Sequence, residues 1–386
     1  MEELTRYSTF SSMLVQYSDG RVSFLPRLQQ FSVNLSTGSV SSGIPRNAYD
    51  LLYKNISPEP VNVPDYRNCL EEVSDSLHSR QQGSRHSFHV SIILKMKDCR
   101  FMFSNGISSC YSHRAGRIAV SESGRIVYKD FGIPDDLQQL RSTLLEAYDE
   151  LVVRLAEDSA DPVATADGPS ADLYLLTPQA AAFFIHEVIG HTLEQDNWNN
   201  KKFELPPDRP FLPSFCSLVD DPAGSPFFRY GDYDDAGNRI RRTEAVVSGQ
   251  YHSGITLLRC SDYTHLPIPR MSCFSLLDNP AGRSFEDMCS AYDSYTVIEE
   301  IANGGVNPFT GDFFISASRQ RYADKNHNRR RLPPATYCGK VPDLCGRILE
   351  IGNDSSPFLG TCSKGNQHLY VCSAAPGMAI TGFHTL

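Results

Sequence analysis

The first third of the chain alternates apolar and polar residues, and this period of two is typical of half-buried strands. Residues 12–25 form two apolar runs, and residues 31–43 continue the same pattern. Residues 86–132 form a longer alternating stretch that predicts an antiparallel meander. Turn-forming pairs interrupt these runs and are expected to connect the strands: Asp19-Gly20, Asn105-Gly106, Ala115-Gly116 and Ser123-Gly124.

Helical periodicity replaces the alternation in two places. Residues 66–80 predict a short helix. From Asp135 onward, apolar residues recur every three or four positions, which predicts an amphipathic helix of about five turns. A polar stretch with Pro and Gly, residues 157–172, follows this helix. It predicts a boundary between a first domain of residues 1–170 and a second domain of residues 171–386.

The second domain is expected to open with a short strand at 172–176, followed directly by a helix. Thr177 is a good N-cap residue, and Pro178 suits the first helical position. Further strands are predicted in residues 215–221, 242–258 and 311–323, and one short helix is predicted in residues 284–292. Strands therefore dominate both halves and helices pack against them, so the pattern predicts an α+β fold.

Composition and charge narrow the range of partners. The formal net charge of −9 over 386 residues argues against nucleic acid as the main partner. No window approaches the about eighteen consecutive apolar residues of a membrane-spanning helix, and the opening MEELTRYSTFSS lacks the apolar region of a secretory signal. Eleven scattered cysteines fit free thiols in a reducing compartment. The sequence predicts a cytoplasmic protein with no nucleic-acid partner and no membrane partner.

The stretch FFIHEVIGHTLEQD, residues 183–196, places two histidines and a glutamate on the predicted helix. His186 and His191 are five residues apart, so in a regular α-helix their side chains diverge by about 140°, whereas a spacing of four gives about 40°. A π-bulge would restore a shared face, and Gly190 is a point where the helix can distort. Two interpretations stay open: a metal site, which needs a third ligand, or a buried and inert histidine pair.

The same stretch resembles the signature of the TldD/PmbA family, His-Glu-x-x-Gly-His-x-x-Glu-x-Asp. On that pattern lie His186, Glu187, Gly190, His191, Glu194 and Asp196. Other segments resemble the family in the same order: the Asp234-Asp235-x-Gly237 turn, YTHLPIPRM at 263–271, GDFFIS at 311–316, IGND at 351–354 and GTCSKGNQ at 360–367. The resemblance covers residues 172–386. It is weak over residues 1–171, where the chain is shorter than the family.

The resemblance implies a two-domain architecture. The amino-terminal domain would be strand-rich with a long helix, and a barrel-like carboxy-terminal domain would carry the His-Glu helix. It also implies a Zn²⁺ ion held by His186, His191 and Cys362, with Glu187 as general base. Two departures occur near the third ligand: Ser363 replaces a glycine, and the order of Gly365-Asn366 is inverted. They can alter the loop without removing the thiol.

Other residues of these motifs have two interpretations each. His265 and Tyr263 lie in a segment that resembles one lining the family's site, where His265 would contact the oxyanion or the substrate. A loop fixed by prolines, with a packed tyrosine, is the alternative. Glu194 and Asp196 would accept hydrogen bonds from the ligand imidazoles, or they form an ordinary helix end.

The preferred hypothesis is a zinc metallopeptidase that cleaves extended or unfolded peptides, with a dedicated peptide or natural-product precursor as one substrate class. The resemblance implies a homodimer, or a heterodimer with a TldE-like subunit. Two alternatives remain. One is a non-catalytic partner subunit of such a complex, and the other is a zinc enzyme that performs different amide chemistry on a peptide. The intact Glu187 argues against the first alternative, because a structural site needs no base beside its ligand.

Overall fold

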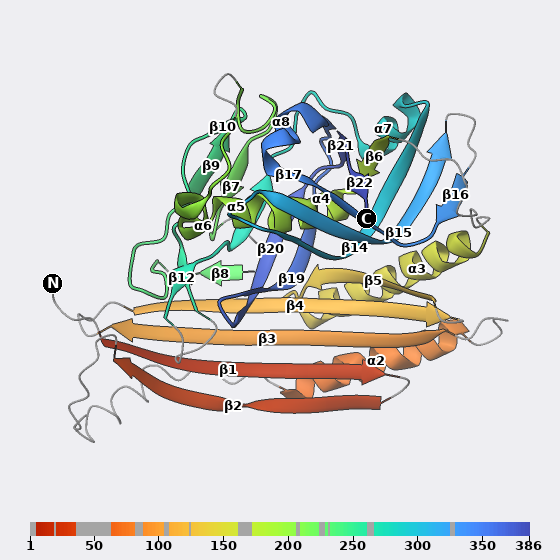
Figure 1. Ribbon diagram of the computed structural model, residues 1–386. Helices are drawn as coiled ribbons and strands as arrows, with labels where there is room; N and C mark the ends of the chain where they lie inside the picture. The colour runs from red at the N-terminus through yellow and green to blue at the C-terminus, as the bar shows by residue number, and fades with distance from the viewer. Residues whose placement is uncertain are drawn as a thin grey trace. The chain divides into compact units, whose positions relative to one another are not determined.

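The computed structural model describes residues 5–18, 21–35, 63–81, 88–103, 108–122, 125–160, 172–205, 209–223, 228–230, 232–260, 266–324 and 329–386 (Figure 1). The chain divides into two compact units. The first comprises Met1–Ser159, Pro226–Ile240 and Cys260–Pro267, and the second comprises Ala160–Ser225, Arg241–Arg259 and Ile268–Leu386. None of the described helices is long and apolar enough to cross a membrane.

The first unit is built on an antiparallel sheet with the strand order β2-β1-β3-β4-β5, and β8 pairs with β4. Its strands are β1 (Thr5–Ser18), β2 (Arg21–Leu35), β3 (His89–Phe103), β4 (Ser108–Glu122), β5 (Arg125–Gly132) and β8 (Phe228–Tyr230). The predicted meander is therefore confirmed for β3, β4 and β5, which pair consecutively. The predicted turns at 19–20, 105–106 and 123–124 lie outside the described residues.

The turn predicted at Ala115-Gly116 is wrong, because both residues lie inside β4. Gly116 pairs across the sheet with Phe131 of β5. A Cβ atom at Gly116 would come within 2.3 Å of the Phe131 Cζ atom. The glycine therefore makes room for an aromatic ring on the neighbouring strand, and it marks a close contact rather than a change of direction.

Two helices, α2 (Val63–Gln81) and α3 (Leu137–Ala160), cover one face of this sheet (Figure 1). Both predicted helices are thus confirmed. Apolar residues at helical spacing on α2 and α3 pack against alternate residues of β3, β4 and β5. The fully buried members of this core include Leu70, Ile92, Leu94, Ile118, Val120, Leu140, Leu144 and Leu151.

The second unit contains two larger sheets and a small pair of strands. One sheet has the order β10-β9-β7-β13-β20-β19, and the other, which curls into half a barrel, has the order β18-β21-β6-β14-β15-β17-β22, with β16 beside β15. Strands of the first sheet are β7 (Leu218–Asp220), β9 (Thr243–Val247), β10 (Gln250–Tyr251), β13 (Cys273–Leu276), β19 (Ser356–Lys364) and β20 (Gln367–Ala375). Strands of the second are β6 (Leu173–Leu176), β14 (Ser294–Val306), β15 (Asp312–Asp324), β16 (Arg329–Leu332), β17 (Ala335–Lys340), β18 (Ile348–Ile351), β21 (Met378–Thr381) and β22 (His384–Thr385).

The remaining elements are short. Apart from the helical segment of residues 178–193, they are the strand pair β11 (Leu258–Arg259) and β12 (Ile268–Pro269) and the helices α6 (Gln195–Asn200), α7 (Phe285–Ala291), η2 (Val341–Asp343) and α8 (Leu344–Arg347). The strands predicted in 172–176, 215–221, 242–258 and 311–323, and the helix near 284–292, are confirmed. The α+β class predicted from the pattern is confirmed as well.

One helical segment runs through the core of the second unit and consists of α4 (Pro178–Phe184), η1 (Ile185–Gly190) and α5 (His191–Leu193). It begins as predicted: the Thr177 hydroxyl accepts a hydrogen bond from the Ala180 amide, and Pro178 is the first helical residue. The residues of this segment share one core with apolar side chains of both sheets. Packing against the two sheets therefore buries most residues of this segment.

The middle of this segment, η1, is a π-helix, so the predicted distortion is confirmed. The amide of His191 donates to the carbonyl of His186, five residues earlier, instead of four. Gly190 lies at the end of the distorted turn and is buried. A Cβ atom there would come within 2.1 Å of the Met271 Sδ atom and 3.1 Å of the Phe274 Cδ1 atom. Packing against Met271 and against Phe274 of β13 thus requires glycine at this point.

Replacing Gly190 by alanine is expected to lower the free energy of unfolding by about 1–3 kcal/mol, because the added methyl group overpacks a closed core. Urea denaturation followed by circular dichroism measures the change. Gly346→Ala is the matched control, since the nearest atom to its added Cβ is 3.9 Å away. Adding Met271→Val to Gly190→Ala should recover part of the lost free energy of unfolding. A urea midpoint equal to that of the wild type for Gly190→Ala alone would contradict the packing argument.

Candidate metal centre

Three side chains that are distant in the sequence meet beside the distorted turn. They are His186, His191 and Cys362, and their donor atoms all lie within 4.8 Å of one another. The two imidazole rings are 5.1 Å apart between centroids, at an interplanar angle of 81°. Because the π-turn adds one residue, histidines five apart project from the same face of the helix. Cys362 reaches them from β19, and its Sγ atom lies 3.1 Å from His191 Nε2.

His186 is completely buried, and among the described residues only one of its two ring nitrogens has a hydrogen-bond partner. Its Nδ1 atom lies 3.0 Å from the hydroxyl of Ser373 on β20. Its Nε2 atom is buried and makes no hydrogen bond to any residue that the structure describes. An orphaned polar atom in a core is costly. A metal ion between the three donors would satisfy it, so the side chains present fit such a group.

His191 is held by a buried carboxylate. Its Nδ1 atom lies 3.0 Å from Glu194 Oε2, which leaves Nε2 directed at Cys362. Burial lowers the pKa of His191, but the charges of Glu194 and Cys362 outweigh burial and raise that pKa well above 6.5. Burial raises the pKa of Glu194, yet His191 and then Lys364 lower it to about 2. Of the two interpretations of Glu194, the structure shows the contact with an imidazole, that of His191.

Cys362 carries the third donor on the inward face of β19. Burial raises the pKa of its thiol, but the charge of His191 and the neighbouring imidazoles outweigh burial and lower the pKa to about 4. The thiol is therefore ionised at neutral pH, and the thiolate is the form that binds metals. The other cysteines whose side chains the structure describes are free thiols and contribute no donor to this cluster.

Glu187 lies beside the cluster and keeps access to solvent. Its Oε2 atom is 3.9 Å from His191 Nε2, and its side chain is 20% exposed, compared with 13% for His191. The neighbouring residues of η1, from Ile185 to Gly190, are otherwise buried. Glu187 is thus the residue of this turn that can exchange protons with water at the cluster.

Two cations tie the segment of Cys362 to Glu194. Lys364 Nζ lies 2.9 Å from Glu194 Oε2 and 2.7 Å from Asp196 Oδ1. The fully buried Arg270 donates to the carbonyls of Cys362, at 2.8 Å, and Lys364, at 3.4 Å, and its Nε atom is 3.8 Å from Glu194 Oε1. Within the described part of the chain, the Asp196 carboxylate pairs with Lys364 and not with an imidazole. It therefore helps to anchor β19, on which Lys364 lies.

The hairpin that carries Cys362 tolerates its departures from the family pattern. Gly365 and Asn366 both have positive φ, 57° and 59°, as the two central residues of a tight type I′ turn require. Ser363 faces the opposite side of β19 from Cys362, and its hydroxyl lies 2.7 Å from the Nδ1 atom of His368. The cysteine therefore keeps its place, while the changed residues lie in the turn and on the outer face.

Ser373 is the residue at this site that the sequence analysis missed. Its side chain lies on the buried face of β20, together with those of Leu369, Val371 and Ala375. A single serine among alternating apolar residues gives little indication of a site, because most such serine hydroxyls form hydrogen bonds with the backbone.

His265 and Tyr263 lie outside the described residues. The Asp234 turn is formed as expected, with the Asp234 carboxylate accepting from the amides of Ala236 and Asn238.

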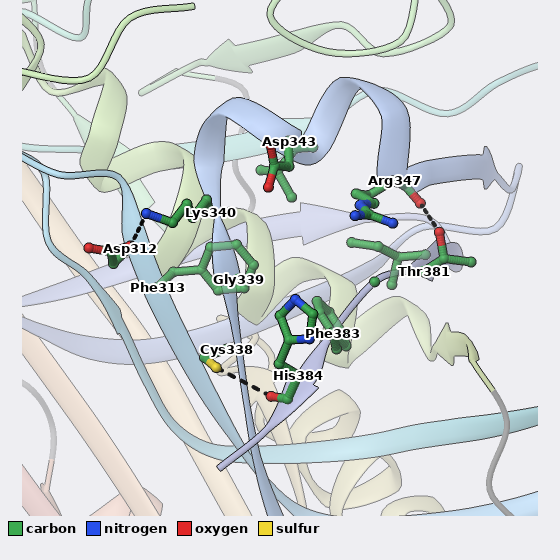
Figure 2. A pocket seen from close by; sticks show the side chains of 13 residues that line it. Asp312, Phe313, Cys338, Gly339, Lys340, Asp343, Arg347, Thr381, Phe383 and His384 are labelled. Carbon is green, nitrogen blue, oxygen red and sulfur yellow. Dashed lines mark hydrogen bonds and ion pairs between the residues drawn. The ribbon is translucent and has the colours of Figure 1, made fainter.

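A cavity of about 330 Å³ lies elsewhere in the second unit, next to β15, β17, α8 and β22 (Figure 2). Phe313, Leu344, Ile380 and Phe383 supply its apolar surface. Lys340 at its rim pairs with Asp312 at 3.1 Å. None of the three candidate donors lines it. The cavity is therefore separate from the cluster of His186, His191 and Cys362.

Sequence relatives of the chain include two archaeal proteins. The chain is 24% identical to a metalloprotease of Methanocaldococcus jannaschii over 212 residues, which cover 51% of this chain and 47% of that protein. It is 23% identical to a metalloprotease of Methanothermobacter thermautotrophicus over 365 residues, which cover 88% of this chain and 78% of that protein. The match to the first relative thus spans about half of its length.

Solved structures share the fold. TldE from Thermococcus kodakarensis superimposes with a TM-score of 0.68 at 11% identity, covering 100% of this chain and 96% of that chain. A Thermotoga maritima protein described as a modulator of a DNA gyrase gives a TM-score of 0.62 at 13% identity, covering 99% and 95%. Residues 174–385, more than half of the chain, match the PmbA/TldA metallopeptidase C-terminal domain. The chain therefore belongs to the PmbA/TldD metallopeptidase family.

Proposed function

We propose that the protein is a zinc-dependent peptidase that hydrolyses peptides bound in an extended conformation. The observation that carries the proposal is the convergence of two imidazoles and one thiolate next to a glutamate that reaches solvent. A set of three protein donors with a neighbouring open position is typical of catalytic zinc sites, whereas structural sites close with four donors. The archaeal relatives named metalloproteases support the same chemistry.

The donor set suits zinc. His186 Nε2, His191 Nε2 and Cys362 Sγ are the atoms that would hold the ion, and two nitrogens with one sulfur are common zinc ligands. A bound zinc ion would supply a Lewis acid that polarises the scissile carbonyl and acidifies water. Ser373 and Glu194 fix the orientation of the two rings through their Nδ1 atoms, so both Nε2 atoms face the third donor.

Proton transfer is assigned to Glu187. Its carboxylate would take a proton from the attacking water and pass it to the nitrogen of the departing amine. Oε2 of Glu187 is close to His191 Nε2, so it faces the region where water and the scissile carbonyl would meet. His265, outside the described residues, remains the predicted contact for the oxyanion or the substrate.

The proposal extends to substrates and partners. An extended or unfolded peptide fits a site built on strand β19 and an adjacent helix, because an extended chain can pair its backbone with a strand. A dedicated peptide or a natural-product precursor is one such substrate. As a member of its family, the chain would act as a homodimer or as a heterodimer with a TldE-like subunit in the cytoplasm. The fold shared with TldE supports the pairing with a TldE-like subunit.

Replacing Glu187 by glutamine is expected to reduce peptide cleavage by about 100-fold or more, because the base that accepts the proton is lost. Cleavage of extended peptides by zinc-loaded protein, followed by mass spectrometry, measures the effect. Zinc content should not change. Glu244→Gln, at an exposed position on β9, should cleave at the wild-type rate. Equal cleavage by the Glu187→Gln variant and wild type would exclude the proposed mechanism and favour a non-catalytic partner subunit.

Replacing Cys362 by serine is expected to weaken zinc binding by about 10-fold or more, because a hydroxyl is a far poorer ligand than a thiolate. Competition with a chromophoric chelator at equilibrium measures the affinity. Cys372→Ser, which removes a buried thiol from the adjacent strand β20, is the control for loss of packing. If both variants keep the affinity of the wild type, Cys362 is not a ligand.

Zinc binding at pH 7 is expected to release about one proton. In the metal-free protein the Cys362 thiol, with a pKa of about 4, is already ionised. The charges of Glu194 and Cys362 raise the pKa of His191, which favours its protonated form, and that proton must leave before Nε2 can bind the ion. Calorimetric titrations in buffers of different ionisation enthalpy count the protons.

The control for this count is Glu194→Gln. Loss of the carboxylate that raises the pKa of His191 should lower the affinity for zinc and move proton release from His191 to lower pH. Release of no proton by the wild type would mean that neither His191 nor Cys362 carries a proton in the metal-free protein, which contradicts the raised pKa of His191.

A further inference from the structure

The buried helical segment has one accessible face, and Glu187 lies in the middle of it. Between Ala180 and Gly190 all residues are buried except Phe183 and Glu187. His191, four residues beyond Glu187, is also partly exposed. Residues spaced by four lie along the same side of a helix. The accessible face therefore runs from an aromatic ring, through the proposed base, to a proposed metal ligand.

Strand β19 presents a matching row of residues. Phe358, Gly360 and Cys362 are spaced by two, so they project from the same face of the strand. A Cβ atom at Gly360 would come within 2.6 Å of the Phe358 Cζ atom. The ring of Phe358 therefore lies over Gly360 and extends along the strand in the direction of Cys362.

The two rows lie against each other. At one end, the rings of Phe183 and Phe358 meet edge to face, with centroids 5.0 Å apart and an interplanar angle of 73°. At the other end, Cys362 lies next to His191. The ring of Phe358 is also 6.4 Å from that of His186. Both phenylalanines are only partly buried. An apolar surface thus stands directly beside the proposed catalytic groups.

One glycine of β14 borders this surface. A Cβ atom at Gly304 would come within 3.0 Å of Phe183 Cε1. Only a hydrogen atom therefore projects toward the Phe183 ring from this position. The nearest cation of the β19 row, Lys364, is engaged by Glu194 and Asp196.

We propose that Phe183 and Phe358 form the contact surface for an aromatic side chain of the peptide, next to the bond that is hydrolysed. The inference rests on the proposed peptidase function. An aromatic side chain can add a third ring to an edge-to-face pair, and such pairs favour centroid separations of about 4.5–7 Å. The position of the two rings beside Glu187 places that side chain adjacent to the scissile carbonyl. Phe183 and Phe358 are specificity residues and take no part in proton transfer.

The test compares two extended peptides that differ at one position, phenylalanine or alanine. Zinc-loaded wild type should cleave the phenylalanine peptide with a kcat/KM about 10-fold higher or more, at a bond adjacent to the phenylalanine. Phe358→Ala should reduce this ratio about 10-fold, and Phe358→Leu, which keeps an apolar side chain and protects the fold, should reduce it less. Phe215→Ala, 37% exposed in a loop before β7, should leave the ratio unchanged. An unchanged ratio in Phe358→Ala would overturn the inference.

A binding measurement separates this inference from the proposed function. Fluorescence anisotropy with labelled forms of the two peptides is measured on the zinc-loaded Glu187→Gln variant, with and without Phe358→Ala. Tighter binding of the phenylalanine peptide that is lost with Phe358→Ala supports the inference, even if the wild type cleaves neither peptide and the peptidase function is wrong. Cleavage without preference leaves the function standing and overturns the inference. Absence of both binding and cleavage rejects both.

Discussion

The arrangement of the candidate centre depends on one backbone hydrogen bond that spans five residues instead of four. The amide of His191 reaches back to the carbonyl of His186, and this turn of five residues brings the two imidazoles onto one face of the helix. In a regular α-helix, whose hydrogen bonds span four residues, two histidines five residues apart would diverge by about 140° and could not share a partner. The distortion is stabilised from outside the helix. Gly190 packs directly against Met271 and Phe274, and the segment is buried among side chains of both sheets.

Charge balance is the second constraint on this region. A buried carboxylate, a thiolate and an imidazolium are each costly to remove from water, and they are tolerated only where partners compensate. Glu194 is the shared partner: it contacts His191 and Lys364 and lies near Arg270. Arg270 and Lys364 in turn hold the β19 backbone and side chains at the site. Motifs separated by more than 150 residues thus form one electrostatic unit.

The sequence predicted the parts of this site that depend on local chemistry. Thr177-Pro178 begins the helix, and the five-residue spacing of the histidines required a bulge, because both follow from the geometry of a few neighbouring residues. Cys362 was found through the resemblance of its motif to a family, since no local rule links residues 171 apart. Ser373 was not predicted, because a serine has no preferred partner in a strand. Ala115-Gly116 was misinterpreted, since a glycine that admits a ring and a glycine that makes a turn look the same in one sequence.

The hairpin of β19 and β20 has a consequence for the stability of the protein. In the described sheet, β19 is an edge strand that pairs only with β20. An ion shared by His186, His191 and Cys362 would act as a cross-link between this edge and the central helix. A link between such distant positions restricts the unfolded chain and ties an edge strand to a buried helix. Removal of the ion would then increase the rate of amide hydrogen exchange in the hairpin. The availability of the metal would therefore control the local order of the hairpin as well as activity.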